Sequence, residues 1–332
     1  MVVLISKAIV GGTLLHEFKT IKTIAQAALP VDERLMIRRC RYAHDADEGA
    51  KRLCIVTGTH GDELAGQYVC FALARRLQAQ PEALHGVVDL YPALNPLGID
   101  TVTRGVPAFD LDMNRLFPGT HDGSAHEQIA AEIVADLQGA DLVLDVHASN
   151  IFLREVLQAR IQREDVERLV PIARLLNLDF VWAYPAATVL QSTLSYSLNE
   201  RHTPCLSIEM DVGMRINTAV GDRLVEGVLN AMAHMGMWTG PVQPVSEPVC
   251  ALEEEKDVVF LNAEASGIYV ADPIEGDRVR AGQRIGRILD PLEGEVLSEI
   301  CAPCDALVFT MRAYPVVYQG SLIARLCKEV RA

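Results

Sequence analysis

A histidine, an aspartate and a glutamate share one glycine-containing bend of the chain, which reads TGTHGDE over residues 57–63. Apolar runs flank this bend at residues 53–56 and 64–77, so it is predicted to join two buried elements. Loops at the carboxyl ends of strands are where α/β proteins place their sites. The spacing of His60 and Glu63 lets an imidazole and a carboxylate converge on one ion, and zinc accepts both kinds of ligand.

A third ligand is predicted at a second strand end. His147 follows the apolar run DLVLDV, so it also lies where a strand reaches its carboxyl end. A catalytic zinc needs three protein ligands and one open position for water. An H-x-x-E pattern arises by chance in many loops, and a lone histidine beside a strand is more often a core residue. The occurrence of both features at two strand ends favours a metal site formed by His60, Glu63 and His147.

The segment between these two strand ends gathers polar groups that suit the binding of a carboxylate. Residues 104–119 read RGVPAFDLDMNRLFPG and place Asn114 beside Arg115, with Arg104 upstream. An arginine fork next to an amide recognises a carboxylate through two parallel charge-assisted hydrogen bonds. Metal-binding histidines usually donate their second N–H to a carboxylate, and Asp112 is the candidate for that position. A purely solvated loop would not explain the apolar residues between these groups.

A glutamate inside an apolar strand is the candidate general base. Glu209 lies in CLSIEMDVG, where an unpaired charge would be costly to bury. Burial would raise the pKa of its carboxyl group toward the working range of a base. A buried ion pair with Arg115 or Arg154 is the structural alternative. Asp211 is a rival base, because strand alternation places it on the same face as Glu209.

The elements that must position these residues alternate along the chain from about residue 50. Near-continuous apolar strands and amphipathic helices predict an α/β domain whose sheet is covered on both faces. Ser124 and Glu127 form a capping-box pattern at the start of one helix. The expected strands are 53–59, 87–94, 141–146, 180–184 and 205–212, and the expected helices are 64–78, 125–138, 166–176, 189–200 and 222–235.

The pattern changes near residue 237. The Pro-rich and acidic segment TGPVQPVSEPVCALEEEK is predicted to be a linker. The short runs after it are broken by glycines and predict a small all-β module, which resembles the barrel-sandwich fold of biotinyl and lipoyl domains. No lysine stands at the central hairpin tip, so a carrier arm is not expected. We therefore predict a catalytic α/β domain over residues 1–240, of which 1–45 are unassigned, and a C-terminal all-β domain over residues 241–332.

The composition of the chain restricts the binding partners and the cellular compartment that we expect for the protein. A formal net charge of −14 argues against nucleic acid and anionic membranes as partners. The apolar stretches fall short of the ~20 residues that a membrane span needs, and the first residues lack the features of a signal peptide. Eight cysteines in mostly apolar runs fit a reducing cytoplasm. The C-x-x-C pair of Cys301 and Cys304 is interpreted as two strand residues flanking a turn rather than half of a zinc site.

Together, these motifs resemble those of the aspartoacylase and succinylglutamate desuccinylase family, within the zinc carboxypeptidase-like fold. The resemblance covers roughly residues 50 to 330 and rests on an ordered set of motifs. They are G-x-H-G-x-E at 58–63, D-x-N-R-x-F-P-G at 112–119, D-x-H at 145–147 and the strand glutamate at 209. The resemblance implies a mixed central sheet flanked by helices, followed by a small all-β barrel-sandwich-like domain.

The resemblance also implies the roles of the catalytic residues. His60, Glu63 and His147 would bind one zinc ion per chain. Glu209 would activate the attacking water and would then protonate the leaving nitrogen. Because the position of the base is occupied by a glutamate, a metal-binding regulator without catalysis is disfavoured.

Substrate-binding residues follow from the same resemblance. Arg104, Asn114 and Arg115 would hold the substrate carboxylate and polarise the scissile carbonyl. Arg201 is the one candidate for a further carboxylate-binding arginine of the family, although its offset does not match cleanly. Some members also lend a tyrosine from the β-domain to the site. The candidates for it are Tyr314 and Tyr318.

The predicted function is that of a zinc-dependent amidohydrolase that removes the acyl group from a small N-acylated amino acid or amine in the cytoplasm. The alternative is a metallocarboxypeptidase that acts on short peptides or cell-wall fragments with the same zinc chemistry. A β-domain that overhangs the site would favour the first function, because it would exclude long chains. The acyl group, the amine and the oligomeric state stay open, with a homo-oligomer among the options.

Overall fold

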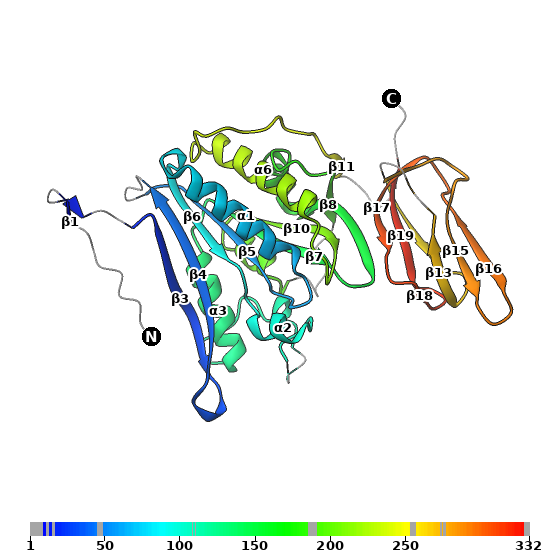
Figure 1. The fold of residues 1–332 in the computed structure, drawn as a ribbon, viewed down its shortest axis with the longest axis horizontal. Helices are drawn as coiled ribbons and strands as arrows, with labels where there is room; N and C mark the ends of the chain where they lie inside the picture. The colour runs from blue at the N-terminus through cyan, green and yellow to red at the C-terminus, as the bar shows by residue number, and fades with distance from the viewer. Residues whose placement is uncertain are drawn as a thin grey trace.

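The computed structural model describes residues 9–10, 13–14, 17–44, 49–107, 109, 111–184, 191–252, 257–272, 274 and 277–328. Its centre is a mixed sheet flanked by helices, and a smaller antiparallel sheet lies toward the C-terminal end of the chain (Figure 1). This arrangement confirms the predicted fold class. Within the described ranges, no helix is both long enough and apolar enough to span a bilayer.

Helices and strands alternate over much of the first 240 residues. The helices are α1 (Ala65–Ala79), α2 (Pro96–Thr101), α3 (Ala125–Leu137), α4 (Val166–Ala173), α5 (Leu194–Asn199) and α6 (Thr218–His234). The strands are β1 (Ile9–Val10), β2 (Thr13–Leu14), β3 (Lys19–Ala28), β4 (Arg34–His44), β5 (Arg52–Thr57), β6 (Gly86–Tyr91), β7 (Leu142–Ser149), β8 (Leu153–Gln162), β9 (Phe180–Tyr184) and β10 (Cys205–Val212).

The parallel strands at the centre of the sheet bury side chains on both faces. β6, β5, β7 and β10 lie side by side in this order, and each pair is parallel. Along β5, Leu53 and Ile55 join the core that α1 and α6 cover, whereas Cys54 and Val56 join the core that α3 covers. Coverage of both faces makes these strands apolar throughout, which is why their sequence pattern is clear. Their carboxyl ends meet at one edge of the sheet, and that edge carries the candidate site.

The predicted strands and helices between residues 50 and 240 are confirmed as elements, with shifts at their ends. The helix expected over 189–200 begins at Leu194, after the N-cap residue Thr193, and residues 185–190 lie outside the described ranges. β8 was missed by the sequence analysis. Its polar residues Glu155 and Gln158 are buried inside the sheet, so its pattern of polar and apolar residues does not indicate a strand.

The N-terminal part that the sequence left unassigned extends the sheet. β3 and β4 form a hairpin, and β4 pairs antiparallel with β6. The fully buried carboxylate of Asp89 accepts hydrogen bonds of 2.7–2.8 Å from Arg41 and Arg52. Arg39 of the same hairpin binds Asp136 of α3 at 2.9 Å. These ion pairs fasten the hairpin to the rest of the sheet.

The strands after residue 240 continue the central sheet and add a second one. They are β11 (Val249–Ala251), β12 (Val258–Asn262), β13 (Gly267–Ala271), β14 (Arg278–Val279), β15 (Arg284–Asp290), β16 (Glu295–Cys301), β17 (Ala306–Arg312), β18 (Val316–Val317) and β19 (Leu322–Lys328). β17 pairs with β8, so β17, β19 and β12 extend the central sheet. β16, β15, β13 and β18 form a separate antiparallel sheet that shares a core with them. We propose a division into two domains at residue 240. The central sheet continues across this division, because β17 pairs with β8.

Two details of the C-terminal part differ from the sequence-based expectation. The segment predicted to be a linker contributes a strand, since β11 pairs in parallel with β9. Cys301 is the last residue of β16, as expected, but Cys304 lies in the bend that follows rather than in the next strand. Both cysteines are free thiols.

Candidate active site

The bend after β5 folds tightly because of two glycines. Gly58 has a φ of +66°, a left-handed conformation that a side chain would strain. Gly61 packs so closely on α2 that an added Cβ atom would lie 1.9 Å from the carbonyl carbon of Gly98. This tight turn carries His60 and Glu63 into the interior, where they are 3% and 4% exposed.

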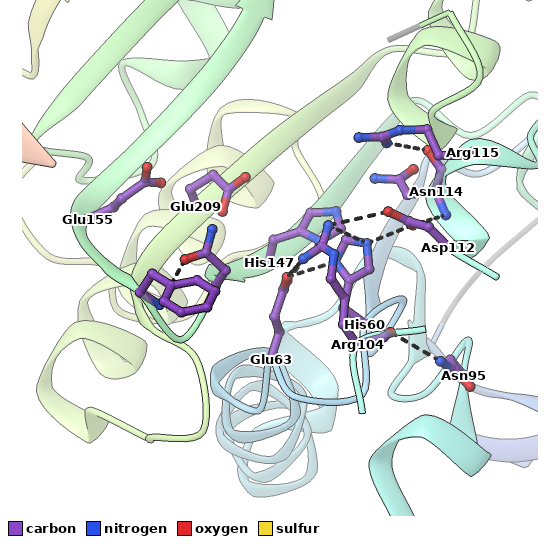
Figure 2. Close-up of polar contacts among 12 residues, drawn as sticks. His60, Glu63, Asn95, Arg104, Asp112, Asn114, Arg115, His147, Glu155 and Glu209 are labelled. Atoms are coloured by element: carbon purple, nitrogen blue, oxygen red, sulfur yellow. Dashed lines mark hydrogen bonds and ion pairs between the residues drawn. The ribbon is translucent and has the colours of Figure 1, made fainter. Parts of the chain in front are cut away.

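His147 meets this pair from the neighbouring strand. β7 lies parallel to β5, so the ends of the two strands are adjacent. Nδ1 of His60 lies 2.8 Å from Oε1 of Glu63, and Nδ1 of His147 lies 3.1 Å from Oε2 of the same carboxylate. One ligand atom from each residue lies within 4.8 Å of the other two, and all three side chains are buried. The structure therefore brings together the three side chains that the sequence predicted as metal ligands (Figure 2).

Both histidines present Nδ1 to the cluster and turn Nε2 toward a second carboxylate. Nε2 of His60 lies 3.0 Å from Oδ1 of Asp112, and Nε2 of His147 lies 3.0 Å from Oδ2 of Asp145. Such partners set the tautomer and the ring orientation of a metal-binding histidine. Asp112 is thus placed beside a candidate ligand as expected, and Asp145 has the same position beside the other one. This position of Asp145 was not predicted from the sequence.

The electrostatics of the cluster suit a cation. Burial lowers the pKa of His60, but the carboxylates of Glu63 and Asp112 outweigh burial and raise it. Burial also opposes the charge on His147, whose pKa Asp145 and Glu63 nevertheless raise well above its usual range. Burial would raise the pKa of Glu63, yet the two histidines hold it well below its usual value. Nδ1 of His60 is buried and faces Oε1 of Glu63 at 2.8 Å, but it makes no well-aligned hydrogen bond to any described residue. The cluster fits a divalent metal ion.

Asp145→Asn is expected to weaken metal binding about 10- to 100-fold, because an amide holds the ring of His147 less firmly than a carboxylate does. Chelator titration followed by metal analysis of the purified protein measures this change. Asp122→Asn, in an exposed loop, is the matched control and should behave like the wild type. Equal metal affinity of Asp145→Asn and the wild type would contradict the orienting role of Asp145.

A mostly polar cavity of about 200 Å³ opens beside the cluster. Asn114 and Arg115 line it from the helical turn after Asp112. Oδ1 of Asn114 accepts a hydrogen bond of 2.9 Å from the backbone N–H of Leu194, and Nη1 of Arg115 donates to the carbonyl oxygen of Asn114 at 2.7 Å. Both side chains are therefore held at the cavity wall. The other small polar residues of the lining are Ser149, Asn150, Thr193, Ser195 and Ser207.

Arg104 also lines the cavity, but its guanidinium group lies against the cluster of His60, Glu63 and His147. Its Nη1 donates to Oε1 of Glu63 at 2.8 Å, and its Nη2 lies 3.0 Å from Nε2 of His60. The side chain keeps 42% exposure, so it is accessible from the cavity. Arg104 is thus close to the predicted site, although it contacts the ligands themselves in this structure.

Three residues named from the family resemblance lie outside the cavity lining. Arg201 is exposed, and its Nη1 donates to the carbonyl oxygen of Ser197 at 2.9 Å. Tyr314 is 44% exposed and packs edge-on against Phe152, with ring centroids 5.6 Å apart. Tyr318 is 72% exposed. The C-terminal strands instead contribute an arginine to the lining, as described below.

Glu209 lines the same cavity from β10. In Figure 2 it lies on one side of the His–Glu–His cluster, with Asn114 and Arg115 on the other side. Oε1 of Glu209 lies 3.0 Å from Nη1 of Arg160, a residue of β8. Burial raises the pKa of Glu209 to about 7, and the charge of Arg160 limits this rise. A carboxyl group with such a pKa can both accept and return a proton near neutral pH.

One expectation about Glu209 is wrong, and its ion-pair partner is not one of those named from the sequence. A buried ion pair, for example with Arg115 or Arg154, was the structural alternative to a general base. Arg154 instead binds Asp277 at 2.6 Å, and Glu209 pairs with Arg160. Asp211 was expected on the same face as Glu209. The pairing of β10 with β8 shifts register between these two positions, and Asp211 has a φ of +51°. This irregularity breaks the alternation, so Asp211 lines a different cavity.

Sequence reasoning missed four ionisable residues of the cavity lining. Glu155 and Arg160 come from β8, Tyr184 comes from the end of β9, and Arg325 comes from β19. Glu155 could have been found by the argument used for Glu209, because it is a charged residue within a strand. The contribution of Arg325 depends on the pairing of distant strands, and no local motif indicates it.

A buried His–Glu–His cluster beside a carboxylate, at the strand ends of a mixed sheet, is the arrangement of a metal-dependent hydrolase. A family sequence model described as the succinylglutamate desuccinylase/aspartoacylase catalytic domain matches residues 49–235, more than half of the chain. The chain belongs to this family, as its motifs predicted. It is accordingly a hydrolase of carbon–nitrogen amide bonds, a deacylase of N-acyl amino compounds.

Several known proteins are similar to this chain. The N-alpha-acetyl-L-2,4-diaminobutyric acid deacetylase of Halomonas elongata is 26% identical over 293 residues, which are 83% of this chain and 81% of that protein. The product-bound structure of the ectoine utilization protein EutE (DoeB) from Ruegeria pomeroyi has a TM-score of 0.77 at 21% identity, over 94% of this chain and 95% of that one. A metallo-carboxypeptidase from Burkholderia cenocepacia has a TM-score of 0.52 at 13% identity, over 66% and 65% of the two chains. The two structures support the fold alone.

Proposed function

We propose that the protein is a zinc-dependent amidohydrolase that releases the acyl group of a small N-acylated amino acid or amine. The observation that carries this proposal is the buried cluster of His60, Glu63 and His147, which shares one cavity with Glu209 and Arg115. The relative from Halomonas elongata is named as a deacetylase of an acetylated diamino acid, and this supports the substrate class.

The three cluster residues would hold the zinc ion, with Asp112 and Asp145 orienting the two histidines. When bound, zinc would lower the pKa of a coordinated water to roughly 7 and would polarise the scissile carbonyl. Side chains of the protein carry out all the other steps. The cavity is small and lined by charged groups, so it can orient a short polar substrate.

Glu209 is the general base in this proposal. Its carboxylate takes the proton of the attacking water and then passes it to the leaving nitrogen, which needs a group that ionises near neutral pH. The pKa of about 7 that burial gives this residue meets that need. The contact with Arg160 holds the carboxylate in place at the cavity wall.

Arg115 and its neighbours act on the substrate. Arg115 stabilises the negative charge that develops on the carbonyl oxygen, a contribution that is usually the largest single electrostatic term. Asn114 and Arg104 bind the carboxylate of the acylated amino acid. Arg104 is accessible from the cavity, so it can exchange its hydrogen bond with Glu63 for one with the substrate.

A metallocarboxypeptidase is the second candidate, because a metallo-carboxypeptidase shares part of the fold. The cavity volume of about 200 Å³ favours a short substrate over a peptide chain. Arg325, which comes from the C-terminal strands, adds a charged group to the wall of the cavity. Both observations support the deacylase.

A substrate panel separates the two candidates. The zinc-loaded protein is incubated with N-acetyl and N-succinyl derivatives of amino acids and diamino acids, and with dipeptides of similar size. We expect kcat/KM for the best acylated amino acid to exceed that for the best dipeptide by about 100-fold or more. The reason is that the two kinds of substrate make different contacts with the cavity residues in the transition state. A dipeptide that is cleaved faster than every acylated amino acid would instead support the carboxypeptidase.

A further inference from the structure

The candidate base lies at the end of a series of ion pairs, and the proposed mechanism uses only the first of them, the contact with Arg160. Nη1 of Arg160 lies 3.0 Å from Oε1 of Glu209. Nη2 of the same guanidinium donates to both carboxylate oxygens of Glu155, at 2.7 and 2.8 Å. One planar group therefore bridges two carboxylates on neighbouring strands. Because Arg160 is held by Glu155, it restricts how the carboxylate of Glu209 can rotate.

A strand irregularity places Glu155 and Arg160 on the same side of β8. An odd and an even position of a regular strand would face opposite sides of the sheet. Glu209 pairs with Gln158, whereas Asp211 pairs with Glu155, so two steps along β10 match three steps along β8. The extra residue is that of a β-bulge, which re-aims side chains. The bulge is what brings the carboxylate of Glu155 to the guanidinium of Arg160.

The far end of the chain of contacts lies in the C-terminal strands. Oε1 of Glu155 also accepts hydrogen bonds from Oγ1 of Thr310 at 3.3 Å and from Nη1 of Arg325 at 3.2 Å. The three residues form one row across the sheet, because Thr310 of β17 pairs with Glu155 of β8 and with Arg325 of β19. The sheet pairing itself thus sets these contacts.

Glu155 is suited to hold other residues rather than substrate. It is 2% exposed, and its carboxylate already accepts hydrogen bonds from three side chains. Arg325 is fixed in turn, since its guanidinium carbon lies 5.6 Å from the ring centroid of Trp182 and 5.7 Å from that of Phe260. Contacts of this kind stabilise a cation over an aromatic face.

We propose that Glu155 is a positioning residue for Glu209, that it acts through Arg160, and that Thr310 and Arg325 of the C-terminal strands keep it in place. The proposal rests on the role of Glu209 as the general base. In this proposal, the C-terminal strands help to position the carboxylate of Glu209 and also form part of the cavity wall.

A kinetic double-mutant cycle on the full-length, zinc-loaded protein tests this proposal. Glu155→Gln keeps the size of the side chain and removes the charge that holds Arg160. It should lower kcat about 10- to 100-fold, the scale of a displaced catalytic group, with KM changed by less than about 3-fold. In the Glu209→Gln background the same change should alter the residual rate by less than about 2-fold, because no base is left to position.

Equal fold losses from Glu155→Gln in both backgrounds would overturn the proposal, because they would show an effect that does not pass through Glu209. A large rise in KM at unchanged kcat would also overturn it, since Arg160 would then bind substrate. Hydrolysis by the wild type, its loss in Glu209→Gln and full kcat in Glu155→Gln would overturn the positioning role alone and leave the proposed function intact.

A milder pair of variants covers the case in which Glu155→Gln does not fold. Thr310→Val keeps the shape of the side chain and removes one hydrogen bond to Glu155, and should lower kcat about 2- to 5-fold. Thr310→Ser keeps the hydroxyl group and should recover most of the wild-type kcat. Equal kcat of Thr310→Val and the wild type would overturn the role of the C-terminal strands.

Discussion

Glu209→Gln is expected to lower kcat by about 10²- to 10⁴-fold, because an amide cannot take the proton of the attacking water. The change keeps the size of the side chain, and none of the three cluster residues is altered. The variant should therefore fold and should bind as much metal as the wild type. Steady-state kinetics on the best substrate of the panel, with metal analysis of the same preparation, measure both quantities.

Asp211→Asn is the matched control for this experiment. It makes the same acid-to-amide change on the same strand, two positions away, but Asp211 lines a different cavity. Its kcat should stay close to that of the wild type. Full activity of Glu209→Gln would end the assignment of the base. A loss confined to Asp211→Asn would transfer the role to the rival carboxylate.

His147→Ala is expected to abolish both stoichiometric metal binding and hydrolysis. The wild type, purified without chelator, should contain about one zinc ion per chain, held by three protein ligands. The variant keeps only His60 and Glu63, which are too few ligands for a catalytic zinc site. Elemental analysis and an activity assay should show the same outcome for His60→Ala.

An exposed histidine supplies the control for metal loss. His121 has a side chain that is 69% exposed, and His121→Ala should keep the metal and the activity of the wild type. Zinc that restores the activity of chelator-treated wild type should not restore His147→Ala. Retention of a full complement of zinc in His147→Ala, or wild-type protein without any divalent metal, would contradict the assignment of the cluster.

The parts of the fold that were predictable are those whose pattern is local. β5, β7 and β10 are apolar along their length because both of their faces are covered. His60 and Glu63 lie within one turn of chain, so their spacing alone indicates that they can meet. His147 was found because a strand end can be recognised by the apolar run before it. The ordered motifs around these residues were sufficient to identify the family.

The amino-acid sequence by itself thus determined the family, the mixed sheet with its covering helices, and the three side chains of the His–Glu–His cluster. Tertiary structure decided which other charges reach the cavity. Glu155 and Arg325 stand far apart in the chain and meet because β8, β17 and β19 pair in one register. The same register shift lies beside Asp211, whose left-handed backbone breaks the strand alternation from Glu209. Strand register and bulges arise from the pairing of distant segments, and the alternation of residues along one strand does not contain that information.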